Sequence, residues 1–442
     1  MDSVLLYILG VVILVIGLAV SIALHEVGHL VPAKRFGVRV GQYMIGFGPT
    51  LFSRRRGETE YGVKAIPLGG YISMAGMFPP RRAGEAGRTA STGFFDTLVQ
   101  DARDVSAETV EEAGEERTFY RLPVWKRIVI MLGGPFMNLV LAFVLYAIVL
   151  CGFGVAQPGT TIASLSECVI PASQERSDCT ASDPAAPAVA AGIEPGDVIV
   201  AIDGRPVDSW ADVQAGIRDD AGQQLTFTVE RDGADVDLQV TPIATERYVT
   251  DADGEVVEVD GQPQVETVGF IGIGPQYEIV QQPITEVPVA VADNVARVAQ
   301  VIVTLPVRLV EVAQAAFGGG ERDPEGPISV VGVGRIAGEI ASLDQVPIAE
   351  RASSMLGILA SLNVALFVFN LVPLMPLDGG HVLGAVLEAI RRGFARMRGR
   401  PDPGPIDTAR WVPVTLAVTV VLGLMSALLI YADIINPISI LP

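Results

Sequence analysis

The three histidines of this 442-residue chain fall in two short motifs, and the first motif is His25-Glu-Val-Gly-His29. On a helix, residues i and i+4 lie on one face, so both imidazoles can bind the same metal ion. In zinc hydrolases with this pattern, the glutamate takes a proton from a metal-bound water whose pKa zinc lowers to about 7. The motif therefore predicts zinc-dependent hydrolysis, with His25 and His29 as ligands and Glu26 as general base.

A catalytic zinc ion needs three protein ligands and one open position, so a third ligand must come from elsewhere. The best candidate is Asp378, in the segment Asn370-Leu-Val-Pro-Leu-Met-Pro-Leu-Asp378-Gly-Gly-His381. Its prolines would break a helix and turn the carboxylate toward a polar cavity. His381 is an alternative ligand, or a group that supports the ligands. The competing interpretation of Asp378 is an ordinary aspartate at a helix end.

Half of the residues are hydrophobic, which is unusual for a soluble protein of this size. Four apolar runs are long enough to cross a hydrocarbon core: residues 4–24, 128–155, 355–372 and 412–431. The first run lacks the basic start and cleavage site of a signal peptide, so we expect it to be retained. Residues 286–317 form a helical pattern broken by Pro306. Their charges favour an amphipathic helix on the membrane over a fifth span.

The distribution of Lys and Arg predicts the orientation. Residues 34–127 carry 15 of them and residues 391–410 carry 6, against 9 in the longer stretch 154–350. Positive loops stay cytoplasmic, so the first two stretches lie inside and the third outside, together with both termini. The same topology places Asp378 and His25 at the same depth, near the cytoplasmic side. The net charge of −19 argues against nucleic-acid binding.

The outer stretch contains a compact mixed α/β pattern. We expect a short helix at 185–191, a strand at 198–202, a helix near 211–217, and paired strands at 225–230 and 236–240 around Asp232-Gly233. Cys168 and Cys179 lie in this oxidising compartment and are expected to form a disulfide, with two free thiols as the alternative. On the inner side, residues 36–77 predict a small sheet or hairpins.

Several motifs together resemble the bacterial site-2 proteases, of the regulator-of-sigma-E protease kind. The matching segments are His25–His29, Gly46-Phe-Gly-Pro49, Ile66-Pro-Leu-Gly-Gly-Tyr71, Gly134-Pro-Phe-Met-Asn138, Gly326-Pro-Ile328 and Asn370 to Gly380. The outer module around Gly192–Gly204 is similar to a PDZ domain. The resemblance implies an α-helical membrane protein with four transmembrane helices, a small cytoplasmic β region and one extracytoplasmic PDZ-like α/β module.

The expected organisation follows the chain in eight parts. They are a first transmembrane helix (1–33), a cytoplasmic β region (34–127) with a disordered insertion (79–118), a second transmembrane helix (128–155), a PDZ-like domain (156–245), an extracytoplasmic strand and amphipathic-helix region (246–350), a third transmembrane helix (351–390), a cytoplasmic loop (391–411) and a fourth transmembrane helix (412–434).

The resemblance also implies a zinc-dependent protease of the plasma membrane that cuts single-pass transmembrane proteins. Anti-sigma factors are the favoured substrates, with signal-peptide remnants and cell-division proteins as alternatives. An unwound substrate would pair with an edge strand from residues 38–75, so Gly69, Gly70 and Tyr71 are candidate substrate-binding residues. Asn363 and Asn370 could hydrogen-bond this strand or the developing oxyanion, and Asn370 fits the family spacing better.

Some roles stay open. Gly134 and Asn138 could serve packing or catalysis, and the PDZ-like module could bind peptide or only exclude large substrates. Three rival functions compete: a membrane scaffold with a vestigial metal site, a zinc transporter, and a soluble peptidase on a membrane tether. The complete set of Glu26, both histidines and Asp378 argues against the first. The absence of acids and histidines from the second and fourth spans argues against the second.

Overall fold

The computed structural model describes residues 3–77, 109–110, 114–174, 176, 178–249, 256–259, 262–320, 322–323 and 326–438. These form two compact units, one of Met1–Phe153 with Gln282–Pro442 and the other of Gly154–Gln281. Most of the insertion predicted at 79–118 lies outside the described residues. Its end carries the first of two short 3₁₀ turns, η1 (Glu115–Arg117) and η2 (Phe119–Arg121).

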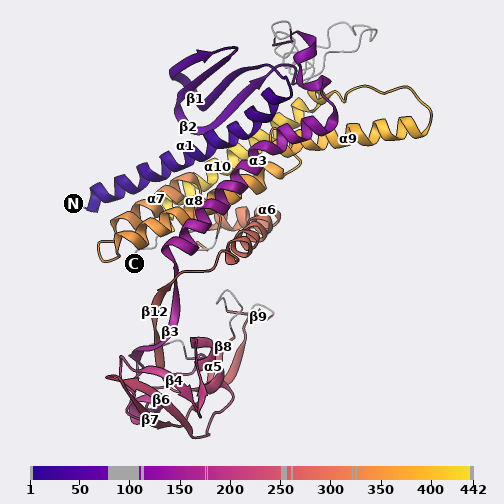
Figure 1. The fold of residues 1–442 in the computed structure, drawn as a ribbon. Helices are drawn as coiled ribbons and strands as arrows, with labels where there is room; N and C mark the ends of the chain where they lie inside the picture. The colour runs from indigo at the N-terminus through magenta and orange to yellow at the C-terminus, as the bar shows by residue number, and fades with distance from the viewer. Residues whose placement is uncertain are drawn as a thin grey trace. The chain divides into compact units, whose positions relative to one another are not determined.

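The first unit is a helical assembly with a small sheet beside it (Figure 1). Its helices are α1 (Ser3–Arg35), α3 (Val124–Ala147, continued by the π-helical η3, Ile148–Phe153), α6 (Glu286–Gly318), α7 (Val330–Ser342), α8 (Ile348–Leu371), α9 (Asp378–Met397) and α10 (Val412–Ile435), with the 3₁₀ turn η4 (Thr408–Trp411) before α10. Five of the described helices are long and apolar enough to cross a membrane, namely α1, α3 with η3, α6, α8 and α10. The chain is thus a multi-pass membrane protein.

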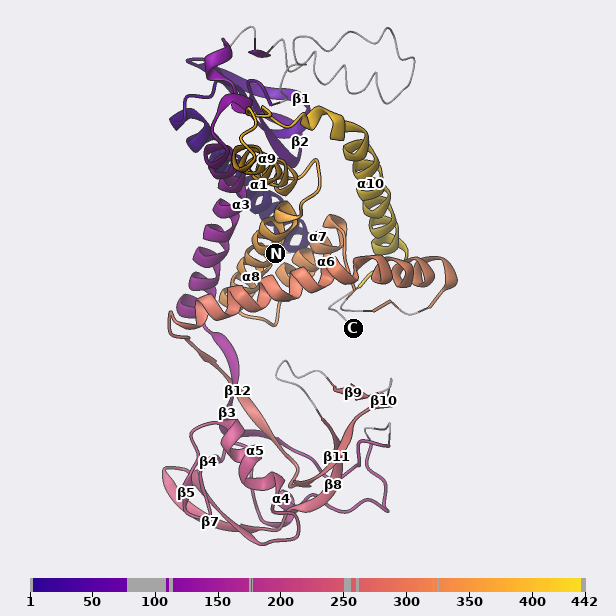
Figure 2. The same ribbon diagram turned by 90° about the vertical axis from the view of Figure 1, so that its right-hand side faces the viewer.

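Helix α6 is the addition to the four predicted spans. We expected Pro306 to interrupt this helix, but the helix continues through it. Just before the proline, the Thr304 hydroxyl donates a hydrogen bond of 3.0 Å to the Gln300 carbonyl. Within this unit, α6 crosses the directions of α3 and α10 steeply (Figure 2). Its exposed polar residues recur along one face, including Asp293, Arg297 and Glu311. These features favour a helix at the membrane surface, so the four-span arrangement stays a prediction.

Helix α1 is held by close backbone contacts on two sides. A methyl group on Gly28 would lie 2.2 Å from the Gly133 carbonyl oxygen of α3. Near the other end of α1, a methyl group on Gly10 would lie 2.5 Å from the Ala337 carbonyl oxygen of α7. Small residues let membrane helices approach closely enough for backbone contact. Helix α7 was not predicted, although Ser329 caps it by accepting hydrogen bonds from Val331 and Gly332.

The small sheet predicted at 36–77 is confirmed. It consists of β1 (Val40–Arg56) and β2 (Thr59–Met74), and both strands fold back on themselves. Residues 42–45 pair with 70–73 on one side and 60–63 on the other, while 52–56 pair with 59–63. The fold-back of β1 passes through Gly46 and Gly48, whose positive φ angles of 91° and 83° suit glycine. The stretch around residues 70–74 is an edge of this sheet and contacts α1.

The second unit, Gly154–Gln281, is longer than the predicted 156–245 domain. Its strands are β3 (Val155–Leu165), β4 (Val198–Ile202), β5 (Arg205–Pro206), β6 (Leu225–Arg231), β7 (Ala234–Val240), β8 (Ile243–Tyr248), β9 (Glu258–Val259), β10 (Gln262–Pro263), β11 (Val265–Phe270) and β12 (Ile273–Val280), with helices α4 (Pro187–Ala190) and α5 (Trp210–Arg218). Because β12 pairs with β3 and β11 pairs with β8, the segment after residue 245 belongs to this unit as well. The strands and helices predicted between 185 and 240 are confirmed.

The core of this unit is the cluster around Phe227, Ile199, Val213 and Ile162, all fully buried. The main sheet has the order β12-β3-β4-β6-β7, with β5 paired to β4. Beside the core, both carboxylate oxygens of Asp197 accept hydrogen bonds of 2.7 Å from Arg231. These bonds hold the pKa of the Asp197 carboxyl below its usual range. The likeness to a PDZ domain stays a prediction.

The predicted disulfide between Cys168 and Cys179 is confirmed, and Cys151 is free. The bridge closes a loop of 11 residues' separation. A bridge across such a loop reduces the conformational entropy of the unfolded chain and so adds about 3 kcal/mol to the free energy of unfolding. We expect serine at both positions to lower the free energy of unfolding of this unit by about 2–3 kcal/mol.

Urea unfolding followed by Trp210 fluorescence measures this loss, in a background where Trp125 and Trp411 are phenylalanine. Trp210 is then the sole tryptophan of the chain and lies in this unit. The control is Cys151→Ser, which removes a thiol and no bridge. An unchanged midpoint for the double variant would contradict the expectation.

Candidate metal centre

The structure brings the three predicted ligands together although they come from distant parts of the chain. The Nε2 atoms of His25 and His29 are 3.2 Å apart, and each lies 3.3 Å from Oδ2 of Asp378. Tetrahedral zinc with ligand bonds of about 2.0–2.1 Å requires ligand atoms about 3.3 Å apart. The near-equilateral triangle therefore matches the spacing that one zinc ion needs.

The hydrogen bonding of Asp378 supports the same fit. Its Oδ2 atom is buried and has no hydrogen-bond donor. A buried carboxylate oxygen without a partner is costly unless a cation satisfies it. Across the described residues, His25, His29 and Asp378 form the one group of three or more His, Cys, Asp or Glu residues close enough to share a metal ion.

The position of the two histidines follows from helix geometry. Both lie on one face of α1, and both are buried. The Nδ1 atom of His29 lies 2.7 Å from the Ile130 carbonyl oxygen of α3, which can only accept a hydrogen bond. The proton is therefore on Nδ1, and the lone pair of Nε2 faces the centre of the triangle.

Gly134 of α3 lies directly against the two imidazoles. A methyl group at this position would be 2.2 Å from Nε2 of His29 and 2.7 Å from Nε2 of His25. No side chain fits there without displacing the metal-facing atoms. Glycine at this position thus has a spatial reason beyond close helix packing, which the sequence did not reveal.

The break between α8 and α9 positions Asp378. Helix α8 ends at Leu371 and α9 begins at Asp378, as expected from the two prolines between them. Methyl groups on Gly379 and Gly380 would lie 2.4 Å and 2.6 Å from backbone atoms of Val372 and Met375. The two glycines therefore allow the chain to fold tightly on itself and start α9 with the carboxylate, an arrangement that a helix N-terminus also stabilises.

Glu26 lies between the metal ligands and the small sheet. A methyl group on Gly70 of β2 would be 3.0 Å from Cγ of Glu26, so the bare backbone of β2 lies against the predicted base. Tyr43 of β1 donates a 2.7 Å hydrogen bond to the Ala23 carbonyl and ties the sheet to α1. Burial and then the Glu26 carboxylate raise the pKa of Tyr43 to about 12, so its phenol remains a donor.

The other predicted site residues lie in different surroundings. Gly69 has a φ of 133° and packs against the Phe47 ring, while the Tyr71 hydroxyl donates to Oε1 of Gln42 at 3.2 Å. Asn370 donates to the Leu366 carbonyl of its own helix at 3.0 Å. None of these contacts involves the metal ligands.

Asn363 is fully buried and donates 2.9 Å and 2.8 Å hydrogen bonds to Ser21 of α1 and to the Leu359 carbonyl. In this conformation it joins α8 to α1. Its predicted substrate-binding role stays a prediction. Ser21, one turn before His25, was not singled out from the sequence.

His381, the alternative ligand, lies one turn after Asp378 and outside the ligand triangle. It lines a small hollow that also contains Arg127 of α3 and Glu388 of α9. Arg127 donates a 2.5 Å hydrogen bond to Glu388, and both side chains are buried. This ion pair fixes α9, and with it Asp378, against α3.

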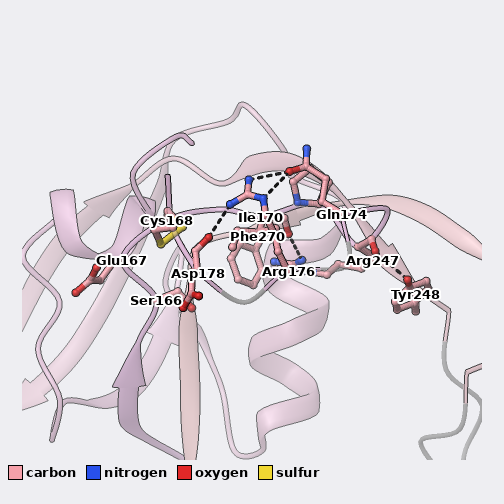
Figure 3. A pocket seen from close by; sticks show the side chains of 13 residues that line it. Ser166, Glu167, Cys168, Ile170, Gln174, Arg176, Asp178, Arg247, Tyr248 and Phe270 are labelled. Carbon is pink, nitrogen blue, oxygen red and sulfur yellow. Dashed lines mark hydrogen bonds between the residues drawn. A yellow bond between two sulfur atoms is a disulfide. The ribbon is translucent and has the colours of Figure 1, made fainter. Parts of the chain in front are cut away.

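A larger hollow of about 790 Å³ lies in the second unit, between the disulfide loop and the ends of β8 and β11 (Figure 3). The Arg247 guanidinium stacks 3.9 Å above the centre of the Phe270 ring and donates to the Ile170 carbonyl at 2.7 Å. Arg176 is engaged by Asp183 and Gln174. Among the described residues, the group that could share a metal ion, His25, His29 and Asp378, does not include any residue that lines this hollow.

Comparison with known proteins decides the family. The model of "Peptidase family M50" matches residues 13–400, which include the whole ligand triangle. The chain belongs to this family, that of the site-2 proteases. It is 35% identical to zinc metalloprotease Rip1 of Mycobacterium tuberculosis over 98% of this chain and 99% of that protein. It is 29% identical to metalloprotease MmpA of Caulobacter vibrioides over 87% and 88% of the two chains.

This member of family M50 is thus a zinc metalloprotease, and its cofactor is Zn²⁺. The predicted enzyme class, cofactor and family are confirmed. The scaffold and transporter alternatives do not agree with this membership.

Proposed function

We propose that this protease hydrolyses peptide bonds within or beside the transmembrane segments of single-pass membrane proteins. His25, His29 and Asp378 hold the zinc ion, and Glu26 is the general base. The observation that carries the proposal is the 3.2–3.3 Å ligand triangle built on α1, a helix apolar enough to cross a bilayer. A metal centre on such a helix suits substrates that also reside in the membrane.

The metal ligands and Glu26 have separate roles in the proposed hydrolysis. When bound, the zinc ion polarises the scissile carbonyl and lowers the pKa of a bound water. Glu26 takes the proton of this water and passes it to the leaving amine. The ligands leave Glu26 free for this role, because the triangle is complete without it.

The edge of β2 is the proposed substrate-binding strand. A substrate helix must unwind before cleavage, and its exposed N–H and C=O groups need partners away from water. Backbone pairing with residues 69–71 supplies them, and the missing side chain of Gly70 keeps the paired strand close to Glu26. Asn370 is proposed to hydrogen-bond the same strand or the developing oxyanion.

The orientation proposed from the charges places the metal centre near the cytoplasmic side of the plasma membrane and Gly154–Gln281 outside. We propose that this outer unit, PDZ-like in character, excludes substrates with large outer domains. Substrates trimmed beforehand on the outer side then enter, and anti-sigma factors are the favoured class. Co-purification of targets with an inactive Glu26→Ala protein would identify them.

Replacement of Asp378 by alanine tests the ligand assignment. We expect the purified protein to hold about one zinc ion per chain, and the Asp378→Ala protein to lose most of it on dialysis, because two ligands remain. Metal analysis gives the zinc content. Asp402→Ala is the control, since Asp402 is an exposed acid in the segment after α9. Full zinc retention by the Asp378→Ala protein would reject the proposed site.

A further inference from the structure

Asn138 of α3 has an unusual environment for an amide. It is fully buried, and its Nδ2 atom lies 3.0 Å from Nδ1 of His25. Its Oδ1 atom is buried and has no hydrogen-bond partner. A buried carbonyl oxygen without a donor costs about 1–3 kcal/mol. The side chain therefore satisfies one of its groups and leaves the other unused beside a metal ligand.

The chemistry of His25 shows what the unused oxygen can do. To bind zinc through Nε2, the neutral imidazole must carry its proton on Nδ1. A buried Nδ1–H then needs an acceptor, as Nδ1 of His29 has in the Ile130 carbonyl. A half-turn of the Asn138 amide exchanges its nitrogen and oxygen and brings Oδ1 to face Nδ1. The Nδ1–H of His25 and the Asn138 oxygen are then paired, and the amide nitrogen takes the place that the oxygen had.

Three residues of α3 lie against the two histidines of α1. Ile130, Gly134 and Asn138 follow each other at intervals of four and so lie on one helix face. The first supplies a carbonyl to His29, the second leaves room for both rings, and the third contacts His25. One face of α3 thus contacts both imidazoles.

We propose that Asn138 is a positioning residue for the metal centre. Its Oδ1 atom accepts the hydrogen bond from Nδ1–H of His25 and so fixes the tautomer and ring orientation that direct Nε2 to zinc. This inference rests on the proposed ligand assignment and deepens it. It differs from a packing role, because a side chain of similar size without an acceptor does not replace it.

Two variants of Asn138 separate positioning from packing. Leucine keeps the approximate volume and removes the acceptor, whereas aspartate keeps an acceptor oxygen. Zinc affinity is measured by competition with a chelator on the full-length protein in detergent. We expect Asn138→Leu to weaken zinc binding about 10–100-fold, the usual effect of removing a hydrogen-bond partner of a ligand. We expect Asn138→Asp to stay within a few-fold of the parent.

Asn294→Leu is the matched control. Asn294 of α6 also has a buried, unpartnered Oδ1, and its Nδ2 donates to Ser361 at 3.3 Å, away from the metal ligands. The same chemical change there should leave zinc affinity unchanged. Unaltered affinity in Asn138→Leu would overturn the inference, and so would an equal loss in the leucine and aspartate variants.

The test is distinct from that of the ligand assignment. If His25→Ala and Asp378→Ala lose zinc while Asn138→Leu keeps it, the proposed metal site stands and the inference about Asn138 fails. If the two ligand variants keep zinc, the ligand assignment itself fails, and with it the role of Asn138.

Discussion

Glu26→Gln protein is expected to bind zinc normally and to cleave a membrane-spanning reporter at least about 10²-fold more slowly than the parent. Removal of a positioned general base typically costs 10²–10⁴-fold in rate. Glutamine keeps the size and most of the polarity of the buried side chain, but it does not accept the proton of the attacking water. The ligand triangle does not include Glu26, so the metal site stays intact.

Reporter cleavage and zinc content, measured on the same preparation, separate catalysis from metal binding. Glu350→Gln is the control, because Glu350 is exposed in the first turn of α8. Cleavage at the parental rate by Glu26→Gln protein would remove the assigned base. Loss of zinc together with activity would instead show that Glu26 supports the metal site.

The second large effect is expected at Gly134, where alanine should weaken zinc binding by about 10–100-fold. Its methyl group would lie 2.2 Å from Nε2 of His29, the atom that faces the metal. Helix α3 has little freedom to withdraw, since α1 and α3 already touch through the backbones of Gly28 and Gly133. Overpacking of this kind costs about 1–3 kcal/mol, and here the strain falls on the ligands themselves.

Chelator competition measures this effect, with Gly423→Ala of α10 as the control. A methyl group on Gly423 meets no atom within 4 Å, so the same substitution adds only helix propensity. Parental zinc affinity in Gly134→Ala protein would show that α3 gives way, and that the contact is less tight than the structure indicates.

The proposed ligand set could be predicted because each part of it depends on local rules. The spacing of His25 and His29 needs only the period of a helix, and a third ligand is a requirement of zinc chemistry. Asp378 was distinguished by prolines that break a helix beside an apolar run. The turn at Asp232-Gly233 was equally local, and both residues have positive φ angles.

Other features depend on contacts that a single sequence does not display. The acceptor for His29 is a backbone carbonyl, which every residue has, so Ile130 carries no signal of its role. Helix α7 has 13 residues and several glycines, too short and too irregular to be recognised from periodicity. The second unit extends to Gln281 because β12 returns to pair with β3, a pairing between strands far apart in sequence.

The separation of the ligands along the chain has a consequence for synthesis. A nascent chain that ends before Asp378 contains both imidazoles and Glu26 but lacks the carboxylate. By the proposed ligand assignment, such a chain lacks a complete metal site even when α1 and α3 are already in the bilayer. We expect protease activity only after residue 378 has been synthesised, and fragments truncated before it are expected to be inactive.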